Sequence, residues 1–221
     1  MELYVLRHGT TEWNRLHLLQ GHTDVPLDEE GRKLAAETGR ALRDVRFDLC
    51  YSSPLSRAVE TARLVLGERD VPILTDPRLE EMNFGDYEGH DCLDDGTAEN
   101  RRIAEAMKMD MHHFDAPPGG ETIQELIART KSFYDEITQN PAMEDKRILV
   151  SMHGGSGRAL MLNAWGGESF WHGCVPKNCT ICIVKLSHGA VTDIRQDVVF
   201  YKTKVRDFYA QDNSTIEEEK V

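Results

Sequence analysis

The chain has 221 residues, a formal net charge of −12, 40% hydrophobic side chains and 29% charged side chains. This size and balance are typical of one globular α/β domain, and the net negative charge argues against binding to a nucleic-acid backbone. The apolar runs are too short for a membrane span, the N-terminus lacks a signal-peptide pattern, and the five cysteines are odd in number, so we expect a cytoplasmic protein with free thiols.

Short apolar runs alternate with amphipathic stretches along the first half of the chain. Asp28 is placed to cap a helix that continues to about residue 44. Ser53-Pro54 matches the cap and the first position of a second helix, which ends at Gly67. The expected strands in this half cover residues 3–6, 47–51 and 71–74.

The second half begins with a segment of different composition. Residues 90–120 are acidic and rich in methionine and histidine, which indicates a small cap insertion with a helix near residues 99–109. Thr122 and Glu125 then form a capping-box pattern at the start of a long helix. Further strands are expected over residues 147–152, 179–186 and 191–201, the last two as a hairpin.

This alternation predicts an α/β fold of three layers, α/β/α, in which helices cover both faces of a mostly parallel central sheet. We expect a single domain over residues 1–221, with the cap insertion at about residues 90–120 and a tail from about residue 205 to the end.

Two of the expected strands end in the same dipeptide. His8-Gly9 follows the first strand, and His153-Gly154 follows the strand over residues 147–152. Ligands of open α/β sheets bind at the carboxyl ends of strands, so both histidines should share one rim with Arg7 and with Arg57, one turn into a helix. Arginine forks and helix N-terminal amides match phosphate oxygens, and the pattern therefore predicts an anion site.

The motifs around these residues resemble those of the histidine phosphatase superfamily, also called phosphoglycerate mutase-like proteins. The signature Arg-His-Gly stands at residues 7–9 and the second histidine at residue 153. The blocks follow the order of the family over roughly the first 200 residues and cover the core but not the cap. They lie at residues 7–14, 20–21, 24–31, 51–62, 79–89, 117–122 and 151–155.

The resemblance implies phosphoryl transfer through a phosphohistidine, with no metal and no cofactor. His8 is the implied nucleophile, a neutral imidazole whose other ring nitrogen should donate to a backbone carbonyl. Glu81 is the implied general acid, which protonates the leaving alkoxide. The other implied site residues are Arg7, Arg57 and His153 around the phosphate oxygens, and Asn14, Gln20, Gly21 and Gly154 as further substrate contacts.

Departures from the mutase pattern favour hydrolysis. A mutase of this superfamily typically carries Glu-Ser/Thr after Arg-His-Gly, then Thr-Gly-Trp, and Asn after the second His-Gly. This sequence has Thr10-Thr11, Gln20-Gly21-His22 and Gly155 in those places. The short cap points the same way, because a mutase must exclude water while phosphate is returned. We expect a phosphomonoester hydrolase that acts on a small phosphorylated metabolite.

Two other functions stay open. One is a cofactor-dependent phosphoglycerate mutase, and the other, of a different class, is a non-catalytic relative that binds a phospho-ligand or a protein. We expect no nucleic-acid and no membrane partner, and the sequence leaves the oligomeric state and the physiological substrate open. It also leaves open the roles of the cap residues Arg101, Arg102, Lys108, His112 and His113.

A cysteine spacing near the C-terminus imitates an iron–sulfur motif. Cys174, Cys179 and Cys182 have the spacing of a plant-type cluster. However, Cys179 and Cys182 stand in an apolar run that is typical of a buried strand, where they would face opposite sides of the sheet. We therefore interpret them as small core residues.

Overall fold

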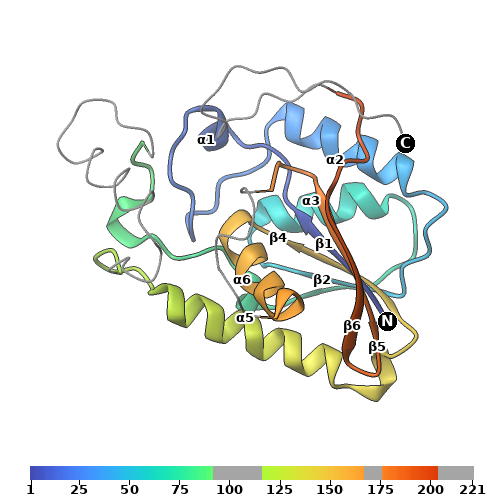
Figure 1. Ribbon diagram of the computed structural model, residues 1–221. Helices are drawn as coiled ribbons and strands as arrows, with labels where there is room; N and C mark the ends of the chain where they lie inside the picture. Colours follow the sequence, from blue (N-terminus) through green and yellow to red (C-terminus); the bar gives the residue numbers. More distant parts are fainter. Residues whose placement is uncertain (92–115, 167–175, 204–221) are drawn as a thin grey trace.

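In the computed structural model, six strands form one sheet between two layers of helices (Figure 1). The structure describes residues 1–91, 116–166 and 176–203. The strand order is β3-β2-β4-β1-β5-β6; the strands from β3 to β1 are parallel, and β5 and β6 are antiparallel to their neighbours. The bounds are β1 (Glu2–Arg7), β2 (Leu49–Ser52), β3 (Ile73–Thr75), β4 (Arg147–Met152), β5 (Ile181–Ser187) and β6 (Ala190–Val198).

In the described part of the chain, two helices cover each face of the sheet, which confirms the predicted three-layer fold. Figure 1 shows α2 (Glu29–Ala41) and α3 (Ser56–Leu66) on one face, and α5 (Ile123–Thr138) and α6 (Gly154–Trp165) on the other. A short helix after β1, which the sequence did not predict, is α1 (Glu12–Arg15). Single 3₁₀ turns cover Pro77–Leu79, Gly85–Tyr87 and Pro141–Met143.

The first strand is buried on both of its faces. Leu3 and Val5 pack into a cluster with side chains of α5 and α6, whereas Tyr4 and Leu6 pack with α2 and α3. A strand between two layers of helices requires such a continuous apolar run. Because β1 lies between β4 and β5, its carboxyl end places residues 7 and 8 at the middle of the sheet edge.

The two described cysteines near the C-terminus also lie on opposite faces, as predicted. Cys179 belongs to the cluster of α2 and α3, and Cys182 to that of α5 and α6. Both are buried, and burial raises the pKa of the Cys182 thiol to about 11. Cys174 lies outside the described residues.

Side-chain caps fix the starts of two helices where the sequence predicts them. The Asp28 carboxylate accepts the N–H of Gly31 at 2.7 Å, and Thr122 and Glu125 form the reciprocal capping box. The predicted cap at Ser53 is wrong, because α3 begins at Ser56 after Leu55, which has an extended backbone and makes no side-chain cap.

Two sequence predictions about strand ends are also corrected. β5 begins at Ile181 rather than at residue 179, because Cys179 adopts a left-handed backbone with φ of 58°. β6 ends at Val198 rather than at residue 201. The helix predicted near residues 99–109, the named cap residues and the predicted tail lie outside the described residues. Within the described part of the chain, no helix is both long and apolar enough to cross a membrane.

Candidate functional site

His8 lies directly after β1, and its ring is held in one tautomer. The N–H of its backbone donates to Met152 on β4 at 2.9 Å, and its ring Nδ1 lies 2.6 Å from the carbonyl oxygen of Gly9. Since a carbonyl only accepts, Nδ1 carries the proton and Nε2 keeps a lone pair. This is the hydrogen bond that the sequence predicted for a nucleophilic imidazole.

The surroundings of His8 also keep its ring uncharged. The side chain is 3% exposed. Burial lowers its pKa well below the ordinary value, and the positive charges of Arg57 and Arg7 lower it further. An imidazole without a proton on Nε2 is the form that can attack phosphorus.

The second histidine lies beside the first. The rings of His8 and His153 are 5.0 Å apart between centroids. Arg57 donates from Nε to Nδ1 of His153 at 3.2 Å, and Ser53 Oγ lies 2.8 Å from Nε2. Because a guanidinium only donates, Nδ1 accepts and the ring proton of a neutral His153 resides on Nε2. Burial and then the charge of Arg57 lower the pKa of His153 well below its ordinary value.

Arg57 reaches this edge from the first turn of α3 and is completely buried. Its two terminal nitrogens donate to backbone carbonyls of one loop, Nη2 to Gly21 at 2.6 Å and Nη1 to Thr23 at 2.9 Å. Burial lowers its pKa to about 10, although the carboxylates of Glu81, Asp24 and Glu88 act in the opposite direction. Together with the Nε bond to His153, these bonds use three of the five donor hydrogens of the guanidinium.

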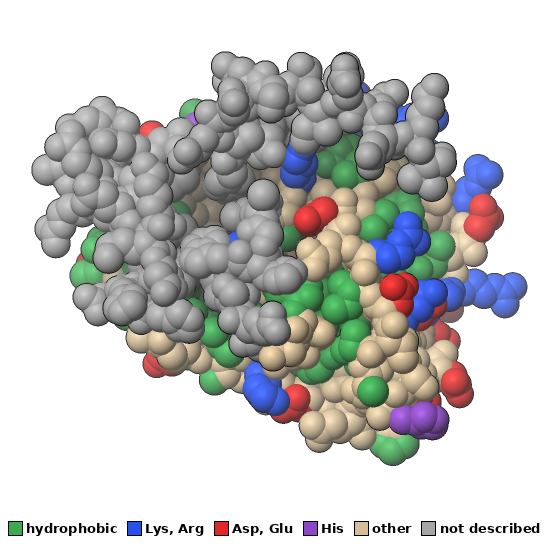
Figure 2. Space-filling model, viewed as in Figure 1, with side chains coloured by type: hydrophobic (Ala, Val, Ile, Leu, Met, Phe, Trp, Pro, Cys, Tyr) green, Lys and Arg blue, Asp and Glu red, His purple; other side chains and the backbone are tan. Residues whose placement is uncertain are grey.

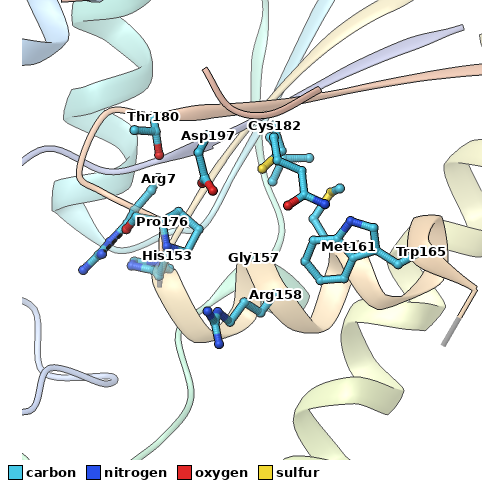
Figure 3. Close-up of a pocket in the computed structure, with 12 residues that line it drawn as sticks. Arg7, His153, Gly157, Arg158, Met161, Trp165, Pro176, Thr180, Cys182 and Asp197 are labelled. Atoms are coloured by element: carbon cyan, nitrogen blue, oxygen red, sulfur yellow. Dashed lines mark hydrogen bonds between the residues drawn. The ribbon is translucent and has the colours of Figure 1, made fainter. Parts of the chain in front are cut away.

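Arg7 ends β1 and is held from the other side of the site. Its Nη1 donates to the carbonyl oxygen of Pro176. Behind it is a cavity of about 20 Å³, the size of one ordered water molecule. Figure 3 shows Arg7 and His153 at one end of this cavity and Trp165 at the other. The cavity therefore lies beside the candidate anion site and is too small for a substrate.

The carboxylate of Glu81 lies on the N-terminus of α6. Its oxygens accept the backbone N–H groups of Gly155 at 2.9 Å and Ser156 at 2.7 Å, as well as its neighbour Met82 at 2.9 Å. His153, the N-cap residue, makes no side-chain cap, so Glu81 supplies the missing acceptor for the first turn. A Cβ atom on Gly155 would lie only 2.8 Å from Glu81 Oε1.

The backbone of Glu81 is held as firmly as its side chain. Its carbonyl oxygen accepts from Arg129 Nη2 at 2.8 Å, and it lies 3.0 Å from Nε2 of His22. Arg129 in turn makes a half-buried ion pair with Glu121 at 2.6 Å. The 79–89 segment thus brings Glu81 to the rim of the parallel strands although it belongs to no strand itself.

The remaining predicted residues lie around this group, and two of them use their side chains internally. The oxygen of Asn14 accepts from the N–H and the hydroxyl of Thr11, both at 3.2 Å. Gln20 donates from Nε2 to the same hydroxyl at 2.8 Å. Gly21 contributes its carbonyl to Arg57, and Gly154 is the first residue of α6.

Asn178 is a site residue that the sequence did not reveal. It is 3% exposed and donates from Nδ2 to the carbonyl oxygens of His8 at 3.0 Å and Gly9 at 3.2 Å. It precedes β5 and lies 170 positions along the chain from His8. Only the antiparallel pairing of β5 with β1 brings it there, so no local pattern could have found it.

This arrangement suits the transfer of a charged group between oxygen and nitrogen. Two buried arginines lie near the buried ring of His8, and a carboxylate lies at the adjacent helix N-terminus. Over residues 1–91, 116–166 and 176–203, no three histidine, cysteine or acidic side chains form a group that could hold a metal ion.

Comparison with known proteins gives two kinds of relative. The sequence profile described as the histidine phosphatase superfamily (branch 1) matches residues 3–195. A 2,3-bisphosphoglycerate-dependent phosphoglycerate mutase of Methylobacterium sp. is 36% identical over 166 residues, covering 72% of this chain and 78% of that protein. One from Lachnoclostridium phytofermentans is 30% identical over 252 residues, covering 98% and 100%. The solved structure of the α-ribazole phosphatase from Shigella flexneri superposes with a TM-score of 0.80 at 30% identity, covering 93% of this chain and 100% of that one.

Proposed function

The chain belongs to the histidine phosphatase superfamily, and on this basis we propose that it is a metal-independent phosphomonoester hydrolase. The observation that carries the proposal is the state of His8, whose Nδ1–H donates to Gly9 and whose Nε2 lone pair is left for attack. Burial beside Arg7 and Arg57 keeps that ring uncharged in the same place where a phosphate dianion would be bound.

In the proposed reaction, His8 Nε2 attacks the phosphorus atom and the bond to the ester oxygen breaks. Arg7 and Arg57 stabilise the charge on the non-bridging oxygens as the phosphoryl group moves in line. Glu81, in its protonated form, gives a proton to the leaving alkoxide, and then takes one from the water that attacks the phosphohistidine. Inorganic phosphate and an alcohol are released, and His8 is again free.

His153 has a different geometry from the one expected of a direct phosphate ligand. Both of its ring nitrogens already have partners, Arg57 at Nδ1 and Ser53 at Nε2. We therefore give His153 the role of orienting Arg57, and a contact with phosphate would require the Ser53 bond to be exchanged.

Hydrolysis is favoured over mutase activity by the environment of Gly155. A mutase typically carries Asn at this place, but a side chain on residue 155 would collide with Glu81 in its position on α6. Thr10 and Thr11, which replace the mutase Glu-Ser/Thr, are completely buried, and Thr10 donates to Asp28, the cap of α2, at 2.7 Å. The mutase function stays the second candidate because the two relatives above are named as mutases.

The proposed substrate is a small phosphorylated metabolite. Charged side chains of both signs are interspersed on the described part of the face in Figure 2, and the net charge of the chain is −12, so we propose neither a nucleic acid nor a membrane as a partner. We extend the proposal to a cytoplasmic location, in keeping with the three buried free cysteines among the described residues.

A phosphomonoester panel tests the proposal, with released inorganic phosphate as the measured product. We expect hydrolysis of para-nitrophenyl phosphate that a chelator does not inhibit. Incubation with 3-phosphoglycerate and 2,3-bisphosphoglycerate should give free phosphate rather than 2-phosphoglycerate. Formation of 2-phosphoglycerate without phosphate release would establish the mutase instead, and a protein that only binds phosphate would be the non-catalytic relative.

A further inference from the structure

Glu88 joins two segments at the edge of the site. It follows the 3₁₀ turn Gly85–Tyr87, and both of its carboxylate oxygens accept hydrogen bonds. Oε1 accepts the backbone N–H groups of His22 at 2.8 Å and Phe84 at 3.2 Å. Oε2 accepts the backbone N–H of Thr23 at 2.6 Å and also the hydroxyl of the same residue. One side chain thus holds the residues of a loop that is more than 60 positions away in the sequence.

The residues that Glu88 binds are part of the loop that holds Arg57. The carbonyl oxygens of Gly21 and Thr23 accept the two terminal nitrogens of Arg57. The peptide group between Gly21 and His22 is shared, because its N–H donates to Glu88 and its C=O accepts from Arg57. The peptide dipole therefore lies between an anion and a cation with its positive end at the anion, and each bond polarises the other.

The backbone of the loop packs closely against Glu88 at Gly21. A Cβ atom on Gly21 would lie 2.2 Å from Glu88 Oε1 and 2.5 Å from the carbonyl oxygen of Met82. The backbone of residue 21 is thus packed directly against the carboxylate. Glycine at this place permits the close approach that the shared peptide requires.

We propose that Glu88 is a positioning residue, which fixes the Arg57 guanidinium in the phosphate site by polarising and immobilising the loop of residues 21–23. This role rests on the proposed function, because it assumes that Arg57 binds the phosphoryl group of the substrate. Glu88 touches no reacting atom in this role. Its effect is to keep the two terminal nitrogens of Arg57 tied to carbonyls, so that the remaining donor hydrogens point in a constant direction.

The substitution Glu88→Gln tests this role with little change of shape. A glutamine side chain can replace only one carboxylate oxygen with an acceptor, and its NH₂ group would face a backbone N–H of residue 22, 23 or 84. The matched control is Glu125→Gln. Glu125 also accepts the N–H and the hydroxyl of one threonine, Thr122, but does so at the start of α5, and no bond connects it with Arg57.

Two measurements on the full-length protein decide the role. The first is the affinity for inorganic phosphate by titration calorimetry, which we expect Glu88→Gln to weaken by about tenfold or more, and Glu125→Gln to leave within about twofold. The second is the solvent exchange of the Arg57 Nε–H by ¹⁵N nuclear magnetic resonance, with the signal assigned from its loss in Arg57→Lys. In Glu88→Gln without ligand, this exchange should become at least about tenfold faster, because Arg57 loses its fixed loop.

The two measurements also separate this role from general loss of structure and from failure of the proposed function. Equal phosphate affinity in Glu88→Gln and wild type overturns the role, and so does weaker affinity with unchanged exchange at Arg57. If the wild-type protein neither binds phosphate nor hydrolyses a phosphomonoester, the proposed function is wrong. The exchange of Arg57 in the ligand-free protein still decides whether Glu88 fixes the guanidinium.

Discussion

Ser53 Oγ lies 2.8 Å from Nε2 of His153, while the other nitrogen of that ring accepts from Arg57. The serine is completely buried, and its hydroxyl is the partner of the one proton that a neutral His153 carries. The residue that the sequence suggested as a helix cap is therefore a support for the second histidine.

Removing this hydroxyl should cost stability. We expect Ser53→Ala to leave a buried imidazole N–H without a partner and to lower the free energy of unfolding by about 1–3 kcal/mol. Urea denaturation measures the change. Ser56→Ala is the control, because its hydroxyl binds Asp24 at an exposed position and should matter by less than about 1 kcal/mol. Equal losses in the two variants would contradict the importance of the Ser53 bond.

The two buried histidines should make stability dependent on pH in the range below about 6.5, the ordinary pKa of histidine. Their native pKa values are lowered, so at mildly acidic pH the unfolded chain binds protons that the native protein does not. The free energy of unfolding therefore falls as pH falls, by up to about 1.4 kcal/mol per histidine for each pH unit. Urea denaturation from about pH 7.5 to about pH 5.5 should show this slope.

Histidine variants show which side chains cause this dependence of the free energy of unfolding on pH. His8→Gln should reduce it, whereas His188→Gln should not, because the His188 side chain is 91% exposed. A free energy of unfolding that is constant or increases on acidification would show that the buried rings take up protons in the native state.

His8→Ala should abolish catalysis through the phosphohistidine. We expect turnover of para-nitrophenyl phosphate to fall by at least about 10³-fold, and the acid-labile label left by a phosphorylated substrate to disappear. Rapid-quench labelling followed by acid treatment measures the second effect. His188→Ala is the control and should keep both. Retained turnover or labelling in His8→Ala would require another nucleophile.

Glu81→Gln should affect substrates according to their leaving groups. An alkyl phosphate needs a proton on its leaving oxygen, so its hydrolysis should fall by about 10²–10⁴-fold, whereas phosphorylation of His8 by the aryl ester should fall much less. Comparing single-turnover rates for serine phosphate and para-nitrophenyl phosphate measures this difference. Equal losses with both substrates would mean that Glu81 acts as a structural cap of α6 and not as the acid.

Gly155→Ala should reproduce part of the effect of Glu81→Gln without changing Glu81 itself. The added Cβ would lie 2.8 Å from Glu81 Oε1 and should displace the carboxylate, which lowers the rate for the alkyl ester more than for the aryl ester. Gly157→Ala is the matched control on the same helix, since among the described residues its Cβ would meet only Met152, at 3.9 Å, and should be neutral or stabilising. The measurement is the ratio of the rate for the alkyl ester to the rate for the aryl ester in each variant. An unchanged ratio in Gly155→Ala would show that residue 155 does not affect proton transfer by Glu81.

The part of the site that sequence could predict is the part carried by regular elements. His8 and His153 each follow a continuous apolar run, and parallel strands bring their carboxyl ends to one edge, so the pair follows from pattern and topology. Arg57 follows in the same way from its place in the first turn of the helix after β2. Asp28 and Thr122 cap their helices because their bonds are to residues three positions away.

The part that sequence could not predict depends on bonds between distant segments. Asn178 and Glu88 act through backbone groups of residues far away in the sequence, and backbone groups have no identity that a sequence pattern could show. Ser53 is not the cap because α3 begins at Ser56, and the Ser53 hydroxyl lies instead beside the ring of a histidine 100 positions later. The contact of Glu81 with the amides of α6 was missed for the same reason, although the family resemblance had already named Glu81.

The place of β1 between β4 and β5 has a consequence for the synthesis of the protein. The strand that presents His8 precedes both of its partners in the chain, pairing on one side with residues 147–152 and on the other with residues 181–185. Asn178, which holds the carbonyls of His8 and Gly9, is made just before the last of these partners. In a nascent chain, this apolar strand therefore has two open edges until residues 147–152 have been made, and the candidate site is complete only after residues 178–185 have followed.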